Sequence, residues 1–285
     1  MAGARPQAQR KPRTSLARMG MYLSLFLATA MIVVPISFAV LGGFRDSGQL
    51  FLDPAGLPDP WVLTNYQAVL QMEAFWRQIV NSIIVAAVTT LGVLALGAMA
   101  AFVFARFAFR GREFIFTVFM LGLLFPVAVA ILPLYILIRD LGLADNMLGV
   151  AIPQIAFGLP LTIFILRSFF RAVPAELEDA AAIDGCSPAG FFWRVLLPIS
   201  RPALATVAVL AIVASWNAFF LPLLVLTSPD MWTLPLGANN FKGEFAADTA
   251  LILAFTTLAM LPALVFYVLA ERQLTGGLTA GSVKG

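Results

Sequence analysis

The chain has 285 residues, of which 61% are hydrophobic and 12% charged, with a mean hydropathy of +0.93 and a net charge of +3. A soluble domain has about 25% charged residues, so a water-soluble globule, a disordered chain and a disulfide scaffold are excluded. With no histidine and one cysteine, Cys186, histidine-based triads and the usual zinc sites are excluded as well. We predict an integral membrane protein.

Six charge-free runs, each of at least 21 residues, follow one another along the chain. A membrane-spanning helix needs about 20 mostly apolar residues, because a charge at the bilayer centre is costly. Barrel strands would instead alternate in polarity over about 10 residues. The sequence therefore predicts an all-α integral membrane protein with six transmembrane helices, over residues 19–44, 78–105, 114–138, 146–166, 202–229 and 249–270.

Lysine and arginine are unevenly divided between the segments that join these runs. If the N-terminus is cytoplasmic, the inside segments hold 14 of the 18 basic residues and sum to +8, whereas the outside segments sum to −5. Because cytoplasmic loops carry the basic excess, both termini are predicted inside: a basic tail over 1–18, the helical domain over 19–270 and a C-terminal tail over 271–285. A cleaved signal peptide is the alternative for the first run, but its apolar region would be only about 7–15 residues long.

The predicted spans contain no charged residue. No GxxxxGK[ST] phosphate loop occurs, so ATP binding by that motif is excluded, and no span contains the ionisable residue that proton-coupled carriers use. Neutral polar and aromatic side chains in the spans are candidates to line a path for a hydroxylated solute. Hydrogen bonding between helices is the alternative role for each of them. These path candidates are Asn81, Gln154, Ser215, Trp216 and Asn217.

The longest predicted cytoplasmic connection, residues 167–201, has the signals of two ordered helices. Three acids at 176–179 follow Pro174 and would occupy the first turn of a short helix, where the helix dipole favours them. Gly185 is placed to end this helix, and Ser187 before Pro188 is typical of the start of the next. The small, acidic face of the first helix favours docking to a protein partner. The alternative is an interfacial helix pair that lies under the membrane.

The same segment resembles the EAA loop of ABC-importer permeases. Asp179-Ala180-Ala181, three further residues, Gly185, nine residues and then VLLP at 195–198 match the family pattern of E-A-A, three residues, G, nine residues and I-x-L-P. Asp179 replaces the usual glutamate and keeps its charge on a shorter side chain. The resemblance implies a cytoplasmic coupling helix, between transmembrane helices 4 and 5, that sits in a cleft of an ATPase subunit. The coupling residues it implies are Glu176, Asp179, Ala180, Ala181, Asp184, Gly185, Leu197 and Pro198.

Two further stretches extend the resemblance. Residues 215–226 (SWNAFFLPLLVL) look like the W-N-x-F-x-x-P-L segment of carbohydrate-type permeases, and residues 277–285 (GLTAGSVKG) are similar to the C-terminal tail of the maltose-type subunit. This family implies a multi-pass permease subunit of the cytoplasmic membrane, not an enzyme, that moves a sugar or oligosaccharide by alternating access. The alternatives are another solute such as a phosphorylated polyol, an ion-coupled secondary carrier, and a non-transporting scaffold.

The resemblance also implies the partners of the chain. They are a homologous second permease, two ABC ATPase subunits that hold ATP and magnesium, an extracytoplasmic solute-binding protein, the lipid bilayer and a sugar substrate. No nucleic acid and no cofactor in this chain are expected. The outside segments 45–77 and 230–248 are candidates to touch the binding protein. Within the second segment these candidates are Asp230, Trp232, Asn239 and Asn240.

Overall fold

The computed structural model describes residues 15–241 and 248–280, with side chains over 18–241 and 248–268, and within these ranges it contains helices and no strand. Most of the predicted basic tail lies outside the described residues, as do residues 242–247 and 281–285. The prediction of an all-α protein is confirmed. In chain order the helices are α1 (Ser15–Gly42), α2 (Ser47–Leu52), α3 (Thr64–Gln71), α4 (Glu73–Arg106), α5 (Arg112–Leu121), η1 (Gly122–Leu124), α6 (Val127–Asp140), α7 (Met147–Ala172), α8 (Glu176–Ile183), α9 (Pro188–Phe191), η2 (Phe192–Leu196), α10 (Leu197–Ile199), α11 (Arg201–Trp216), α12 (Phe220–Val225), η3 (Pro229–Met231), η4 (Leu234–Phe241) and α13 (Thr249–Ala280).

Four helices are long and apolar enough to cross a membrane by themselves, namely α1, α4, α7 and α13. Two further candidates are bent pairs. The first joins α5 and η1 to α6 at an angle of 101°, and the second joins the segment from α9 to α10 to α11 at 77°. The described residues therefore provide four spans, or up to six if each bent pair crosses the membrane once.

The structure corrects two of the predicted spans, because runs 114–138 and 202–229 do not form continuous helices. In the first run, Phe125 and Pro126 are extended, with ψ angles of 117° and 113°. A proline disfavours the α conformation in the residue before it, which explains the break. In the second run, the helix is interrupted at residues 217–219, between α11 and α12.

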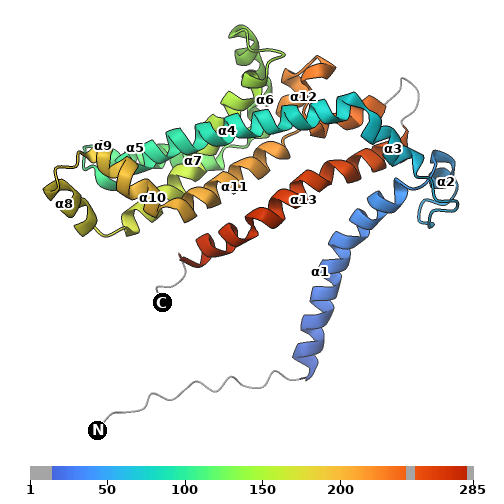
Figure 1. Cartoon of the computed structure of the whole chain (residues 1–285), viewed down its shortest axis with the longest axis horizontal. Coiled ribbons are helices and arrows are strands. Elements are labelled where there is room, and N and C mark those ends of the chain that lie inside the picture. Colours follow the sequence, from blue (N-terminus) through green and yellow to red (C-terminus); the bar gives the residue numbers. More distant parts are fainter. Residues whose placement is uncertain (1–14, 242–247, 281–285) are drawn as a thin grey trace.

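The centre of the molecule is a pair of long helices, α4 and α7, with α11 packed along both (Figure 1). Two glycines of α4 allow this close approach. A Cβ added at Gly92 would lie 2.3 Å from Cδ1 of Ile155, and one added at Gly97 would lie 2.3 Å from Cγ2 of Thr162. Small residues at the contact let the backbones of membrane helices approach closely. The tight pair forms the base on which the sites described below are built.

The two ends of the bundle carry different segments. At one end α8, α9 and α10 surround a buried cluster that includes Phe170, Phe191 and Leu196. α2 and α3 lie at the opposite end, and α1 slants away from the bundle (Figure 1). Most side chains of α1 are exposed, and Met31 is 81% exposed. The predicted cytoplasmic segment 167–201 and the predicted outer segment 45–77 therefore lie far apart.

Candidate functional site

The short helix α8 begins and ends as the sequence predicts. Three acids lie in its first turn. At its other end Gly185 has a φ of 77°, and the N–H groups of Gly185 and Cys186 donate to the carbonyls of Ala182 and Ala181 at 3.0 and 2.8 Å. This is the Schellman pattern of a helix that ends at glycine. A Cβ at Gly185 would meet nothing within 4 Å, so the glycine is needed for its backbone conformation rather than for space.

α8 offers an exposed surface at one end of the molecule (Figure 1). None of its residues is buried, and Ile183 is 87% exposed. Ala181 and Leu197 are half-buried and pack on the cluster around Phe191. The structure places the remaining predicted coupling residues in exposed positions at the same end, and these are Glu176, Asp179, Ala180, Asp184, Gly185 and Pro198.

Arg106, the last residue of α4, ties α8 to the long helices. Its Nη2 donates to the carbonyl of Val173 at 2.9 Å, its Nη1 lies 3.5 Å from Oε2 of Glu178, and its guanidinium lies 6.0 Å from the ring centroid of Phe191. The Arg106 side chain is only 9% exposed. These contacts join α4, α7, α8 and α9. In the sequence Arg106 is a basic residue at the end of a charge-free run and in the last turn of a helix, and both features are too common to identify a contact.

A second charged group joins α4, α5 and α7. Arg167 of α7 is buried, and its Nη2 lies 2.5 and 2.7 Å from the two carboxylate oxygens of Glu113 in α5. Its Nε donates to the carbonyl of Phe104 in α4 at 3.2 Å, and its guanidinium lies 3.7 Å from the ring centroid of Phe116. The sequence marks Arg167 only as the end of a charge-free run, because its partners belong to other helices.

A cavity of about 500 Å³ lies between α6, α7, α11 and α12. Its wall is mostly apolar and includes the rings of Phe157, Phe219 and Phe220. Within the described part of the chain, no residue that lines the cavity is charged. The volume falls within the range of about 300–1,000 Å³ that is typical of small-molecule sites.

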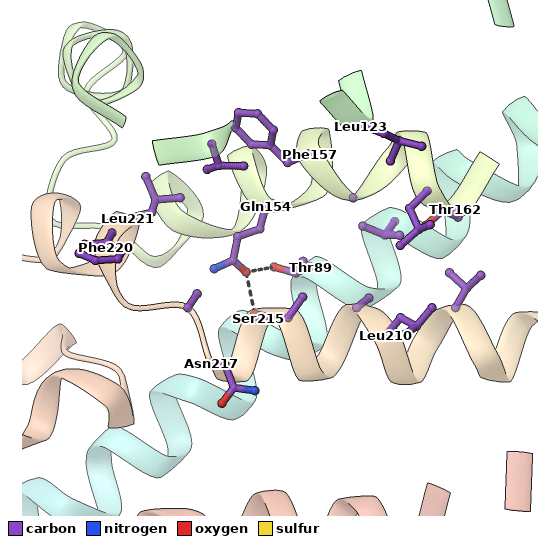
Figure 2. Close-up of a pocket in the computed structure, with 18 of the residues that line it drawn as sticks. Thr89, Leu123, Gln154, Phe157, Thr162, Leu210, Ser215, Asn217, Phe220 and Leu221 are labelled. Atoms are coloured by element: carbon purple, nitrogen blue, oxygen red, sulfur yellow. Dashed lines mark hydrogen bonds between the residues drawn. The ribbon is translucent and has the colours of Figure 1, made fainter. Parts of the chain in front are cut away.

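Three polar side chains meet at this cavity, from α4, α7 and α11 (Figure 2). Oε1 of Gln154 accepts hydrogen bonds from the hydroxyl of Thr89 at 3.0 Å and from the hydroxyl of Ser215 at 2.6 Å. Gln154 and Ser215 are predicted path residues, and the structure brings them together. Thr89 is one of several threonines in the apolar helices, and nothing in the sequence distinguishes it from the others.

The other three predicted path residues lie elsewhere. Asn81 is buried, and its Nδ2 donates to the carbonyls of Asp230 and Trp232 at 2.8 and 3.0 Å, so it anchors the segment that begins with η3. Trp216 lines a separate groove of about 730 Å³ between α4, α11 and α13. Asn217 borders both spaces, but its Nδ2 donates to a carbonyl one turn back in α11 at 2.8 Å, and the side chain points away from Gln154 (Figure 2).

The segment from η3 to η4, which is predicted to lie on the outer side, is held against α4 and α12. The carboxylate of Asp230 pairs with Arg77 of α4, and the indole N–H of Trp232 donates to the carbonyl that follows α12 at 3.1 Å. Asp230 and Asn240 are exposed, whereas Trp232 and Asn239 are half-buried. The four residues predicted to meet a binding protein therefore lie on one short segment, two of them fully accessible.

Asp145 joins the loop before α7 to the loop after α12. Its Oδ1 accepts hydrogen bonds from the backbone N–H groups of Thr227 at 3.0 Å and Ser228 at 2.9 Å, and its Oδ2 accepts from the hydroxyl of Ser228. The hydroxyl and the N–H of Ser228 hold the pKa of Asp145 below its ordinary value. Asp145 has a φ of 53°, in the left-handed region that aspartate and asparagine tolerate better than most residues.

Curated proteins resemble this chain over most of its length. The diacetylchitobiose uptake system permease protein NgcG of Streptomyces coelicolor is 32% identical over 262 residues, which cover 91% of this chain and 87% of the relative. The arabinooligosaccharides transport system permease protein AraQ of Bacillus subtilis is 29% identical, with coverages of 96% and 98%. The trehalose transport system permease protein SugB of Mycobacterium tuberculosis is 35% identical, with coverages of 80% and 84%.

A solved structure and a family model agree with these relatives. A bacterial ABC transporter involved in the import of the acidic polysaccharide alginate contains a chain of the same fold, with a TM-score of 0.78, 21% identity, and coverage of 94% of this chain and 99% of that one. The family model described as binding-protein-dependent transport system inner membrane component matches residues 93–275, which include α8. The resemblance of the chain to this family is thus confirmed. The chain belongs to the inner membrane components of binding-protein-dependent transport systems, and is a multi-pass transport protein of the cytoplasmic membrane rather than an enzyme.

Proposed function

We propose that this chain is the permease subunit of an ATP-driven ABC importer that moves a sugar or oligosaccharide into the cell. The observation that carries the proposal is α8, an exposed helix with the spacing of the coupling loop, which Arg106 anchors to the membrane domain. The sugar class follows from relatives named for diacetylchitobiose, arabino-oligosaccharides and trehalose. A phosphorylated polyol is not favoured, because none of the described residues in the cavity wall is basic.

Six spans with both termini in the cytoplasm are part of this proposal. The spans are α1, α4, the α5–α6 pair, α7, the pair that ends in α11, and α13. They make up a domain over residues 19–270, between cytoplasmic tails over 1–18 and 271–285. The excess of basic residues in the inside segments supports this orientation. The separation of α8 from α2 and α3 also supports it, because these segments are assigned to opposite sides of the membrane (Figure 1).

The importer would contain this chain, a second permease, two ATPase subunits and a solute-binding protein. ATP and magnesium would be bound by the ATPase subunits, with no cofactor in this chain. The exposed apolar side chains of α1 support a partner within the membrane, since the second permease and lipid would cover them. On the outer side, the binding protein would contact the segment that carries Asp230, Trp232, Asn239 and Asn240.

Coupling would begin when ATP closes the ATPase dimer and displaces α8. Because Arg106 links α8 to α4 and α7, the displacement would reach the two central helices as a rigid-body movement. The cavity beside Gln154 and Ser215 would then open to one side of the membrane and close to the other, a shift between two populated states. The residues proposed to transmit the movement from the ATPase are Glu176, Asp179, Ala180, Ala181, Asp184, Gly185, Leu197 and Pro198.

Reconstitution of the chain with its partner permease, ATPase and binding protein in liposomes tests the proposal. We expect uptake of at least one sugar among labelled diacetylchitobiose, trehalose and an arabino-oligosaccharide, and this uptake should require both ATP and the binding protein. Uptake that continues without the ATPase subunit and stops with an uncoupler would instead identify a secondary carrier. Absence of accumulation of any solute with all partners present would favour a scaffold.

A further inference from the structure

The amide of Gln154 is satisfied on one side only. Its Oε1 accepts from two hydroxyls, whereas its Nε2 is buried and has no hydrogen-bond partner within the described part of the chain. Figure 2 shows the nitrogen directed away from both hydroxyls. Buried donors without a partner are rare and costly, so this nitrogen marks a place where an acceptor is missing from the isolated chain.

Gln154, Thr89 and Ser215 can still form hydrogen bonds both with a donor and with an acceptor. Both hydroxyl protons are used by Oε1 of Gln154, so the oxygens of Thr89 and Ser215 keep lone pairs for a further donor. Nε2 supplies N–H groups for an acceptor. A hydroxyl group complements this set, because it accepts through its oxygen and donates its hydrogen. A cation does not, because it cannot accept from Nε2.

The surroundings of the group select a neutral ligand with apolar faces. The described wall residues include no charged side chain, and three of them, Phe157, Phe219 and Phe220, are aromatic. Of the two other polar residues in the wall, one already uses its N–H group in a hydrogen bond and the other lies farther from the Gln154 amide. Asn217 already donates within α11, and Thr162 lies two turns further along α7 (Figure 2).

We propose that Gln154, Thr89 and Ser215 form a solute subsite that binds a hydroxyl group of a neutral glycan, with Nε2 of Gln154 as the donor. This inference rests on the proposed sugar import and adds the position at which the sugar is held in this subunit. The final torsion of a glutamine side chain is broad, so a small rotation turns Nε2 toward the cavity. The rings in the wall then cover the apolar face of the sugar.

Gln154→Met tests the subsite, because it keeps the length of the side chain and removes its hydrogen-bonding groups. The matched control is Thr206→Val, a polar-to-apolar change on α11 at a residue that does not line the cavity and whose hydroxyl donates to the carbonyl of Pro202 in its own helix. Both variants are reconstituted as complete transporters and supplied with the labelled diacetylchitobiose, trehalose or arabino-oligosaccharide that the wild-type complex imports. The rate of uptake and the ATP hydrolysis stimulated by the loaded binding protein are measured together.

For Gln154→Met we expect uptake to fall about ten-fold, the loss that one hydrogen bond to solute would cause, while stimulated ATP hydrolysis stays near the wild-type rate. Thr206→Val should keep both the uptake and the stimulated hydrolysis. Unchanged uptake in Gln154→Met, or a parallel loss of uptake and hydrolysis, would overturn the subsite, because the parallel loss indicates a packing role. If Gln154→Met does not assemble, Thr89→Val and Ser215→Ala decide the question, and full uptake in both would overturn it. A wild-type complex that imports none of these sugars contradicts the proposed function itself, and the subsite falls with it.

Discussion

Arg106, at the end of α4, contacts Glu178 in the first turn of α8, with Nη1 and Oε2 3.5 Å apart. An ion pair at a fully exposed surface would contribute little to stability. The Arg106 side chain is only 9% exposed, however, and its Nη2 also donates to the carbonyl of Val173, the residue after α7. One side chain therefore ties α8 to the ends of both central helices.

Arg106→Gln should uncouple ATP hydrolysis from uptake. The substitution removes the contact with Glu178 and keeps one shorter amide group, so α8 would move without displacing α4. We expect the ratio of sugar imported to ATP hydrolysed to fall roughly ten-fold, within the range of coupling free energies of 1–3 kcal/mol. The measurement is parallel uptake and phosphate release in liposomes. Arg110→Gln is the control, since Arg110 is exposed on the linker after α4, and an equal loss in that variant would contradict the role of Arg106.

Gly185→Ala should weaken the end of α8. The φ of 77° costs an alanine about 1–2 kcal/mol, and the Schellman hydrogen bonds would be strained. We expect lower ATP hydrolysis in response to the loaded binding protein, although the permease still assembles in the membrane. Gly185→Asn should retain more activity, because asparagine tolerates the left-handed conformation. If both variants hydrolyse ATP at the wild-type rate, the coupling role of this segment is refuted.

The pair formed by Glu113 and Arg167 should respond unequally to removal of its two partners. Arg167 is 6% exposed and Glu113 is 58% exposed in their side chains. Glu113→Ala would leave a buried guanidinium without its carboxylate, whereas Arg167→Met would leave a solvated carboxylate that Arg171 also contacts. We expect Glu113→Ala to lower the melting temperature in detergent by several degrees and Arg167→Met to lower it less. The reverse order would show that packing of the Arg167 side chain dominates.

Asp145→Asn should loosen the contact between the loop before α7 and the loop after α12. Asparagine keeps the left-handed backbone and one acceptor oxygen for the N–H groups of Thr227 and Ser228. It removes the charge, and it replaces the oxygen that accepts from the Ser228 hydroxyl with an NH2 group. The pKa of Asp145 is lower in the folded chain than in the unfolded chain, where it is about 3.9. Its contribution is therefore complete above the unfolded value and is lost as the pH falls through the folded value.

We expect the wild type to lose thermal stability more steeply than Asp145→Asn when the pH is lowered below about 4. Melting curves of both proteins between neutral and acidic pH test this. Parallel pH profiles of the two proteins would show that the Asp145 carboxylate does not contribute to stability.

Features that depend on neighbouring residues are predicted well from the sequence. The acids, Gly185 and the Ser187–Pro188 pair place both ends of α8 and the start of α9 correctly, because helix caps are local structures. The break at Pro126 also depends on local geometry. A count of apolar residues does not reveal it, because hydropathy contains no information about backbone conformation. Lengths of charge-free sequence therefore identify membrane segments without showing where they bend.

Features that depend on distant residues are not visible in the sequence. Asn81 and Gln154 are both amides in apolar helices, yet Asn81 holds the segment that begins with η3 and Gln154 lies at a cavity. The difference comes from the segments that pack against them, which are about 150 and 60 residues away in the chain. Arg106 and Arg167 are boundaries of apolar runs in the sequence and become contacts only when the helices assemble.

α7 has the Gln154 amide in its first third and, directly after its last residue, the Val173 carbonyl that Arg106 contacts. The two points are about 28 Å apart along the axis, at 1.5 Å per residue. A free-energy coupling between two binding sites is reciprocal. If ATP binding changes the affinity of the cavity for sugar by some factor, sugar in the cavity must change the affinity of the ATPase for ATP by the same factor. A loaded permease would therefore adjust the ATP concentration at which its own ATPase responds.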